Sequence, residues 1–241
     1  MMTRHEQQGF SLVELMIAMT LGLIVTGAIL KTFIANSQSM ELQRAAVGLQ
    51  EEGRATIDYI TRYVRMAGFR ETSLEEGSLS DGLSGAASSI SIKFKAAASN
   101  ATGSTDNPKP IAVLRDCLGT MVSNAAESVN LFQQVGNELV CQATINGGSA
   151  ASAALISNVQ ELRILYGVDS DGDGIANQYK TTTGSDDVVL LKVCLRLRGG
   201  ADIVSPAATY KMCDGSDDGT PSQKLERRIE TTIALRNRVG S

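Results

Sequence analysis

The amino-acid sequence predicts an α+β fold, in which a long N-terminal helix with a membrane-spanning first half packs by its second half on an antiparallel β-sheet head. Two observations predict the helix. Residues 10–30 form an apolar run whose only charge is Glu14, and no proline occurs before position 108. A third observation predicts the head, because the later part of the chain holds short runs in which apolar and polar residues alternate, as they do in half-buried strands.

The apolar run, Phe10–Leu30, is long enough to cross a bilayer. As a helix its 21 residues span about 31 Å. A secretory signal would have a shorter apolar core followed by a small-residue cleavage site, whereas here the small residue Gly9 precedes the run. We therefore expect the segment to be retained in a membrane. The alternative is the core helix of a soluble protein.

Glu14 is the unusual residue of this run. An ionisable side chain inside a membrane helix is costly, so its presence predicts a function and a partner of opposite charge. The alternative is a position among the lipid headgroups, where Glu14 would need no partner.

Helical periodicity continues beyond the apolar run to Ala67, and Gly68 is typical of the residue that ends a helix. Apolar residues recur there mainly at steps of three, four and seven, while charged residues supply the solvated face. Because Gly48 and Gly53 weaken an isolated helix, we expect this second half to be stabilised by packing against the head.

The head is predicted to be rich in β-strands. Strands are expected at residues 89–96, 131–135, 138–145, 159–168, 187–199 and 229–237. Gly136 and Asn137 separate two of these runs and predict a tight hairpin turn. Segments rich in Ser, Gly and Ala are expected to be loops at 77–89, 96–107 and 147–154.

The chain has four cysteines, all beyond the apolar run and none at metal-binding C-x-x-C spacing: Cys117, Cys141, Cys194 and Cys213. This pattern predicts two disulfides in an oxidising compartment. Three pairings are possible, and we expect each cysteine to pair with its sequence neighbour, which gives Cys117–Cys141 and Cys194–Cys213. The alternative is four reduced, buried thiols.

Composition argues against two classes of function. A net charge of -4, a pI near 5.1 and basic residues that do not cluster argue against a nucleic-acid-binding face. The only histidine is His5, before the apolar run, and no phosphate-binding, dinucleotide-binding or nucleophile-elbow glycine motif occurs. We expect a structural protein rather than an enzyme; a paired-carboxylate hydrolase is the catalytic alternative that the composition leaves open.

The segment DSDGDGIAN places oxygen-bearing side chains at alternate positions around a glycine turn. It resembles the first nine positions of EF-hand and dockerin calcium loops, with Gly174 at position six and the backbone carbonyl of Ile175 at position seven. The candidate ligands of calcium are Asp169, Asp171, Asp173 and Asn177. Position twelve is Lys180, where those loops have a bidentate acid, so this ligand would have to come from Asp186 or Asp187. The alternative is a solvated hairpin loop whose Asp and Gly residues serve turn geometry.

The residues Gly9-Phe10-Ser11-Leu12-Val13-Glu14, directly before an apolar helix, resemble the type IV prepilin cleavage motif. The resemblance implies that a short polar leader, Met1–Gly9, is removed by an inner-membrane aspartyl peptidase. The cut would fall between Gly9 and Phe10, and the same enzyme would methylate the new amine on Phe10.

The same resemblance implies that Glu14 acts in assembly. In the family, the glutamate of an incoming subunit pairs with the N-terminal amine of its neighbour, which sets the axial register of the fibre. A carboxylate and an ammonium are each costly in a membrane, but as a pair they neutralise one another. The implied partners are the prepilin peptidase, other minor pilins, the major pilin and the inner-membrane assembly platform.

Short matches in the rest of the chain, YITRYVRMAGF, YGVDSDGDG and ALRNR, resemble PilW-type minor pilins. The resemblance implies a leader at 1–9, a transmembrane and assembly helix at 10–35, an amphipathic half of the same helix at 36–68 and a periplasmic β-rich head at 69–241. Such a protein crosses the inner membrane once before it enters a surface pilus.

The function implied is that of a minor pilin that is incorporated in a type IV pilus and helps to initiate its assembly, in support of adhesion, twitching motility or DNA uptake. The alternative is a J-type pseudopilin of a type II secretion system, which shares the plan of a long helix and a β head. A third hypothesis, compatible with the first, is a binding module whose head contacts surfaces or ligands.

Overall fold

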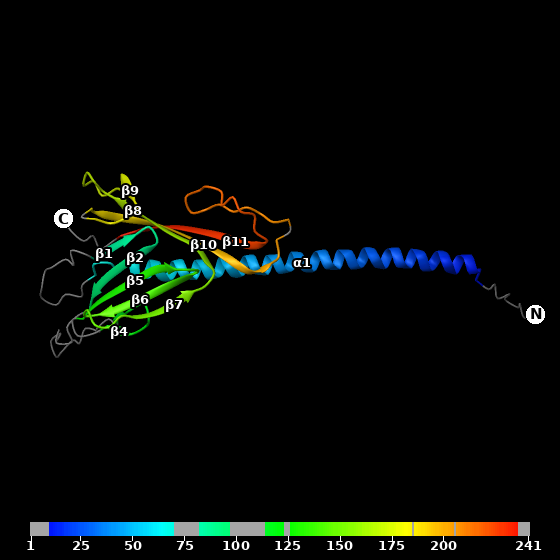
Figure 1. The fold of residues 1–241 in the computed structure, drawn as a ribbon, viewed down its shortest axis with the longest axis horizontal. Helices are drawn as coiled ribbons and strands as arrows, with labels where there is room; N and C mark the ends of the chain where they lie inside the picture. The colour runs from blue at the N-terminus through cyan, green and yellow to red at the C-terminus, as the bar shows by residue number, and fades with distance from the viewer. Residues whose placement is uncertain are drawn as a thin grey trace, which may run out of the picture. The chain divides into compact units, whose positions relative to one another are not determined.

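The computed structural model describes residues 10–69, 82–96, 114–122, 126–184, 186–204 and 206–235. The chain divides into two compact units, with the boundary between Arg44 and Ala45. The first unit is helical from Leu12 onward, and the second holds the remaining helical residues together with all the described strands. The predicted α+β class, with one long N-terminal helix and antiparallel sheets, is confirmed (Figure 1).

The single described helix, α1, covers Leu12–Val64. It ends close to the predicted point, because the residues after Val64 form turns and Gly68 adopts a positive φ of 70°. The backbone N–H of Gly68 then donates to the carbonyl of Lys93, 2.9 Å away. A glycine is suited to this position because it adopts the left-handed conformation without steric cost.

The part of α1 that belongs to the second unit supplies one side of the core. Its buried residues are Leu49, Gly53, Thr56, Ile57, Ile60, Tyr63 and Val64. A Cβ at Gly53 would overlap the end of the Ile229 side chain and lie 3.3 Å from Leu197 Cδ1, so a larger residue would force Ile229 to move. The hydroxyl of Tyr63 donates to the carbonyl of Asp116 at 2.7 Å, which ties the helix to the head.

The larger sheet has five antiparallel strands in the order β1-β2-β5-β6-β7. Their bounds are Leu83–Ala86 for β1, Ser89–Lys95 for β2, Glu127–Val135 for β5, Glu138–Ile145 for β6 and Ala151–Ile156 for β7. The predicted hairpin is present between β5 and β6, where Val135 pairs with Glu138 and Gly136 has a φ of 60°.

The second sheet has four strands in the order β11-β10-β8-β9, and a two-stranded sheet joins β3 to β4. The bounds are Leu114–Arg115 for β3, Met121–Val122 for β4, Val159–Val168 for β8, Gln178–Lys180 for β9, Val188–Asp202 for β10 and Lys224–Ala234 for β11. Every pairing is antiparallel, and a long connection, residues 203–223, joins β10 to β11.

The core lies between the apolar faces of the sheets and α1. Its largest fully buried side chains include Tyr166, Phe94, Phe132, Ile60, Leu139, Ile164 and Leu191. The two large sheets are joined by hydrogen bonds as well, because Ile164 N donates to Ala87 O at 2.7 Å. The buried hydroxyl of Tyr166 also donates to Ser89 O at 2.8 Å.

Two segments expected to be loops contain strands. The segment 147–154 holds the start of β7, which pairs with β6 from Ala151 onward, and the segment 77–89 contains β1. Asn146 and Gly147 both have positive φ, 50° and 66°, so they turn the chain back along β6. Hydrogen bonds between the backbones of β6 and β7 then form the strand, although the side chains of β7 are small. The prediction of a loop was therefore wrong, because it relied on composition. The loop expected at 96–107 falls outside the described residues except for Ala96.

Candidate functional site

The start of α1 brings Phe10 and Glu14 within about one helical turn of each other along the chain. Phe10 is 86% exposed, and Glu14 is the acidic residue of the first turn. The helix is already hydrogen-bonded at this point, because Leu15 N donates to Ser11 O at 3.1 Å. Gly9, the predicted residue before the cleavage point, lies outside the described residues.

The first unit presents its apolar side chains on all sides of the helix. Every residue from Phe10 to Glu41 is exposed, and the most apolar window of α1 has a mean hydropathy of 2.2. Such a helix is long and apolar enough to cross a membrane. Together with the cleavage motif, it fits a membrane-anchored protein.

The threonine hydroxyl groups of this apolar segment are internally satisfied. Three threonines donate to carbonyl oxygens one turn earlier: Thr20 to Ile17 at 2.9 Å, Thr26 to Gly22 at 2.8 Å and Thr32 to Ala28 at 3.0 Å. A polar group without a partner would be costly in lipid, and these bonds remove that cost. Between Phe10 and Leu30, Glu14 is the only residue with a charged side chain.

Both disulfides have the pairing expected from the sequence. Cys117 is bonded to Cys141 with their Cα atoms 6.3 Å apart, and Cys194 is bonded to Cys213 with their Cα atoms 5.8 Å apart. The first lies in the core, where both cysteines are buried. The second joins β10 to the connection between β10 and β11.

Residues 206–223 of that connection form an irregular hairpin, which we call the clamped loop. Ala208 and Ser222 exchange backbone hydrogen bonds at 3.0 and 2.8 Å, and Asp218 N donates to Tyr210 O at 2.9 Å. Within the turn, hydrogen bonds from Ser216, led by its hydroxyl, hold the pKa of the Asp214 carboxyl below its ordinary value.

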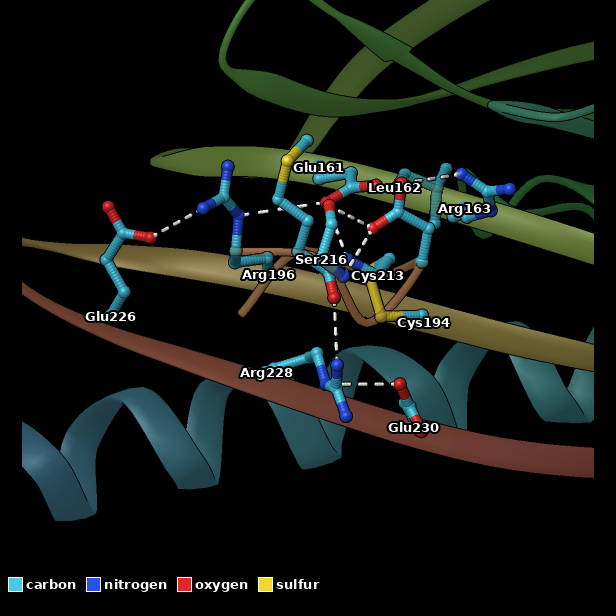
Figure 2. Close-up of a disulfide and its surroundings, with 12 residues drawn as sticks. Glu161, Leu162, Arg163, Cys194, Arg196, Cys213, Ser216, Glu226, Arg228 and Glu230 are labelled. Atoms are coloured by element: carbon cyan, nitrogen blue, oxygen red, sulfur yellow. Dashed lines mark hydrogen bonds and ion pairs between the residues drawn. A yellow bond between two sulfur atoms is a disulfide. The ribbon is translucent and has the colours of Figure 1, made fainter. Parts of the chain in front are cut away.

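The clamped loop is fastened to the outer face of the four-stranded sheet at several points (Figure 2). Besides the disulfide, Cys213 N donates to Glu161 Oε2 at 2.9 Å, and Arg228 Nη1 donates to Met212 O at 2.8 Å. This cover explains why Cys194 and Arg196, which alternate with the core-facing residues of β10, are nevertheless buried.

A cluster of charges lies beneath the loop. Arg196 Nη1 lies 3.1 Å from Glu226 Oε2 and also forms an ion pair with Asp218. Arg198 Nε lies 2.6 Å from the other oxygen of Glu226, whose side chain is 1% exposed. Buried ions are tolerated only when they are paired, and here each acid faces an arginine. The cluster therefore holds the loop on the sheet.

Sequence reasoning missed this cluster. The signal available was the alternation of Arg196 and Arg198 with leucines in β10, which puts both arginines on one face of the strand. Their acidic partners come from β8, from the clamped loop and from β11, and nothing local in the sequence brings these segments together.

A groove of about 420 Å³ lies beside the Cys194–Cys213 disulfide, on the same face of the sheet. Arg163, Lys192 and Glu230 supply its charged lining. Lys192 Nζ lies 4.1 Å from the centre of the Tyr179 ring, where a cation is attracted to the aromatic face. The volume falls in the range of small-ligand sites.

The acidic loop between β8 and β9 gathers the three predicted aspartates. Oxygens of Asp169, Asp171 and Asp173 all lie within 4.8 Å of one another. Asn177 Oδ1 accepts hydrogen bonds from Ser170, from Oγ at 3.0 Å and from N at 3.3 Å, so its side chain faces the same loop. Three of the four residues expected to be ligands are therefore brought together, and Asn177 is bonded within the same loop.

Backbone hydrogen bonds also organise this loop. The carboxylate of Asp169 accepts from Gly172 N and Gly174 N, each at 2.7 Å, and both glycines have positive φ. Burial acts to raise the pKa of Asp169, but these hydrogen bonds outweigh it and the pKa lies below its ordinary value. Lys180, at position twelve, binds Asp186 Oδ1 at 2.7 Å, so the carboxylate of Asp186 is directed to that lysine.

Two parts of the chain match models of known protein families. Residues 121–237 match the family model described as type IV pilus-assembly protein W, and residues 4–30 match the model of the prokaryotic N-terminal methylation motif. None of the curated proteins compared with the chain matches it. A solved type IV-like pilin from Thermus thermophilus is 12% identical with a TM-score of 0.48, over 78% of this chain and 96% of its own, a similarity too weak to support a conclusion.

The two matches fall on separate parts of the chain, one on the apolar helix and one on the β-rich head, and they name the same class of protein. The methylation motif implies processing by a prepilin peptidase and assembly with other pilins. The chain belongs to the type IV pilin-like proteins, and within them to the PilW type.

Proposed function

We propose that this protein is a minor pilin that is incorporated in a type IV pilus and helps to initiate its assembly. The observation that carries the proposal is the position of one charged residue, Glu14, in the first turn of α1, where the helix is apolar and every residue from Phe10 to Glu41 is exposed. A lone carboxylate there is costly in a bilayer unless a cation of another molecule meets it.

The cation we propose is the α-amine of a neighbouring subunit, formed at Phe10 when the leader Met1–Gly9 is removed. Glu14 lies one helical turn after that amine in its own chain. When each subunit presents an amine and a carboxylate one turn apart, an incoming carboxylate can meet the amine of the subunit above it. This pairing would set the axial register of the fibre.

Helix packing supports an intermolecular role for the first unit. An added Cβ at Gly22 or at Gly27 would meet nothing within 4 Å, so nothing within the chain requires glycine at these two positions. Small residues in membrane helices let neighbouring backbones approach closely. We therefore propose that this part of α1 packs against the helices of other pilins, with the head on the periplasmic side before assembly and on the pilus afterwards.

Deletion of the coding sequence tests the proposal. The surface pili of the deletion and parent strains are counted, and their exported proteins are compared. These measurements distinguish a subunit of a type IV pilus from a subunit of a type II secretion system. We expect pili to be lost or strongly reduced, together with twitching or adhesion, while secreted enzymes are exported as before. Normal piliation with failed export would identify a J-type pseudopilin of a type II secretion system instead.

A second proposal concerns calcium. We propose that Asp169, Asp171, Asp173 and Asn177 bind Ca²⁺ in the loop between β8 and β9. The hydrogen bonds from Gly172 and Gly174 also fit the alternative of a turn alone. What supports an ion is that oxygens of the three carboxylates lie within 4.8 Å of one another. Like charges at this separation repel, and a hard cation with oxygen ligands would remove the repulsion. The ion would stabilise the head rather than take part in a reaction.

A further inference from the structure

The two large sheets have four edge strands, and three of them are protected. β1 is bound by a neighbouring segment, since Gly85 N donates to Thr183 Oγ1 at 2.9 Å and Thr183 N donates to Gly85 O at 3.1 Å. β9 is only three residues long. β11 is rich in charge, with Lys224, Glu226, Arg227, Arg228 and Glu230 in one strand. Short, covered or charged edges resist pairing with other chains.

The fourth edge, β7, has none of these protections. Its sequence is Ala-Ser-Ala-Ala-Leu-Ile, without charge or proline, and within the described part of the chain it pairs only with β6 (Figure 1). Its first four residues, 151–154, are exposed. The pairing of these residues with β6 is regular, and the one register shift lies beyond them, toward Ile156. An exposed, uncharged and regular edge presents unpaired backbone N–H and C=O groups to an incoming strand.

The register shows what such a strand would cover. Ala153 lies opposite Cys141 and Ala151 lies opposite Ala143, and both residues of β6 are buried on the core side of the sheet. Ala151 and Ala153 face the same side, yet they are exposed. The core face of the sheet therefore continues to β7, but in the described residues nothing covers it there.

We propose that β7 is a docking edge that pairs with an extended strand from the head of a different pilin subunit. The proposal rests on the function proposed above. The strand that fits has uncharged side chains at alternate positions, small or apolar, to cover Ala151 and Ala153, while its other face is free to be polar. The contact is heterologous, because pairing of two β7 strands would close a dimer, whereas a fibre needs a contact that continues from subunit to subunit.

The full chain, expressed in its own host, tests the proposal through substitutions. Ala153→Lys puts a charge on the face that the incoming strand must bury. Ala153→Thr is the control at the same position, because threonine is uncharged and favourable in strands. Thr232→Lys is the matched control, because it adds the same charge at an exposed position of β11. We expect recovery of Ala153→Lys in sheared fibres to fall about tenfold, as for a central interface position, while the other two variants are recovered as the wild type is.

A second measurement needs no variant. Amide hydrogen exchange of the wild-type chain is compared between sheared fibres and the membrane-extracted subunit, and alternate amides in residues 151–154 should exchange at least about tenfold more slowly in fibres. A photo-crosslinking residue at position 153 should join β7 to a strand of another pilin.

The outcomes separate the two proposals. Unchanged exchange in β7, with wild-type recovery of Ala153→Lys in fibres, overturns the docking edge and leaves the proposed function intact. A cross-link between two copies of β7 also overturns it. Absence of the wild-type chain from fibres contradicts the proposed function itself. If Ala153→Lys fails to form its two disulfides, the exchange measurement alone decides.

Discussion

Arg196 and Glu226, thirty residues apart in the chain, form a buried ion pair with 3.1 Å between Nη1 and Oε2. The pair lies where the clamped loop covers the four-stranded sheet, and Arg198 binds the second oxygen of the same carboxylate. Glu226 therefore pairs with two arginines at once. Its removal would leave Arg196 buried with Asp218 and Glu161 as its remaining acids.

We predict that Glu226→Ala lowers the free energy of unfolding of the full chain by about 3 kcal/mol, because it removes the buried carboxylate that pairs with both Arg196 and Arg198. Asp217→Ala is the matched control. Asp217 binds Lys211 at 2.9 Å, but the two side chains are 63% and 58% exposed, and an exposed pair is worth less than about 1 kcal/mol. Denaturant unfolding of both variants in detergent checks the prediction, and equal losses would contradict it.

Two buried tyrosines predict instability at alkaline pH. Burial raises the pKa of Tyr166, and burial together with its neighbour Tyr59 raises the pKa of Tyr63. An ordinary tyrosine ionises near pH 10, so above that pH the unfolded chain loses protons that the folded chain keeps. The resulting stability is fully present below about pH 10 and is lost as the pH rises further.

Tyr166→Phe separates this effect from packing. The variant loses the hydrogen bond from the hydroxyl to Ser89 O, so at pH 8 it should be less stable by about 1 kcal/mol. Its stability should then decline less steeply than that of the wild type between about pH 10 and pH 12. Tyr179→Phe is the control, because Tyr179 is 45% exposed. If the stabilities of Tyr166→Phe and of the wild type declined equally over this pH range, the Tyr166 hydroxyl would not cause the loss of stability at alkaline pH.

The calcium proposal predicts a thermal shift. At a hundredfold excess over its dissociation constant, Ca²⁺ should raise the midpoint of thermal unfolding by about 5 °C. Asp171→Ala should abolish the shift, whereas Asp217→Ala, outside the acidic loop, should keep it. An unchanged midpoint for the wild-type chain would leave the turn alternative as the account of this loop.

Glu14→Gln tests the role of the carboxylate in assembly. The amide is cheaper in lipid than the ion, so cleavage and membrane insertion should be retained, while attraction to a neighbour's amine is lost at a cost on the order of 1–3 kcal/mol. Glu41→Gln, an exposed acid further along the same helix, is the control. The measure is the fraction of each variant in sheared fibres relative to membranes. Equal fractions for Glu14→Gln and the wild type would contradict the role in assembly and favour the alternative that Glu14 lies among the lipid headgroups.

The sequence predicts well where side-chain patterns are local. The strand β6 at Glu138–Ile145 and the strand β8 at Val159–Val168 have the expected bounds, because alternating apolar residues mark one buried face. The end of α1 was also predictable, since Gly68 supplies the left-handed conformation there. The disulfide pairs followed from sequence proximity alone.

The features that were missed depend on segments distant in sequence. The strand β7 has no alternating pattern, and it forms because a turn at Asn146 and Gly147 lays its backbone along β6. The cluster around Arg196 draws acids from three separate elements. Such contacts are specified by the tertiary fold, and no local property of the sequence indicates them.

The most direct test of the account is the mass of the N-terminal peptide of this chain recovered from sheared surface fibres. We predict a peptide that begins at Phe10 and carries one methyl group on its α-amine, because removal of the leader creates the cation that Glu14 of a neighbour must meet. A fibre-bound chain that still begins at Met1 or Met2 would contradict it.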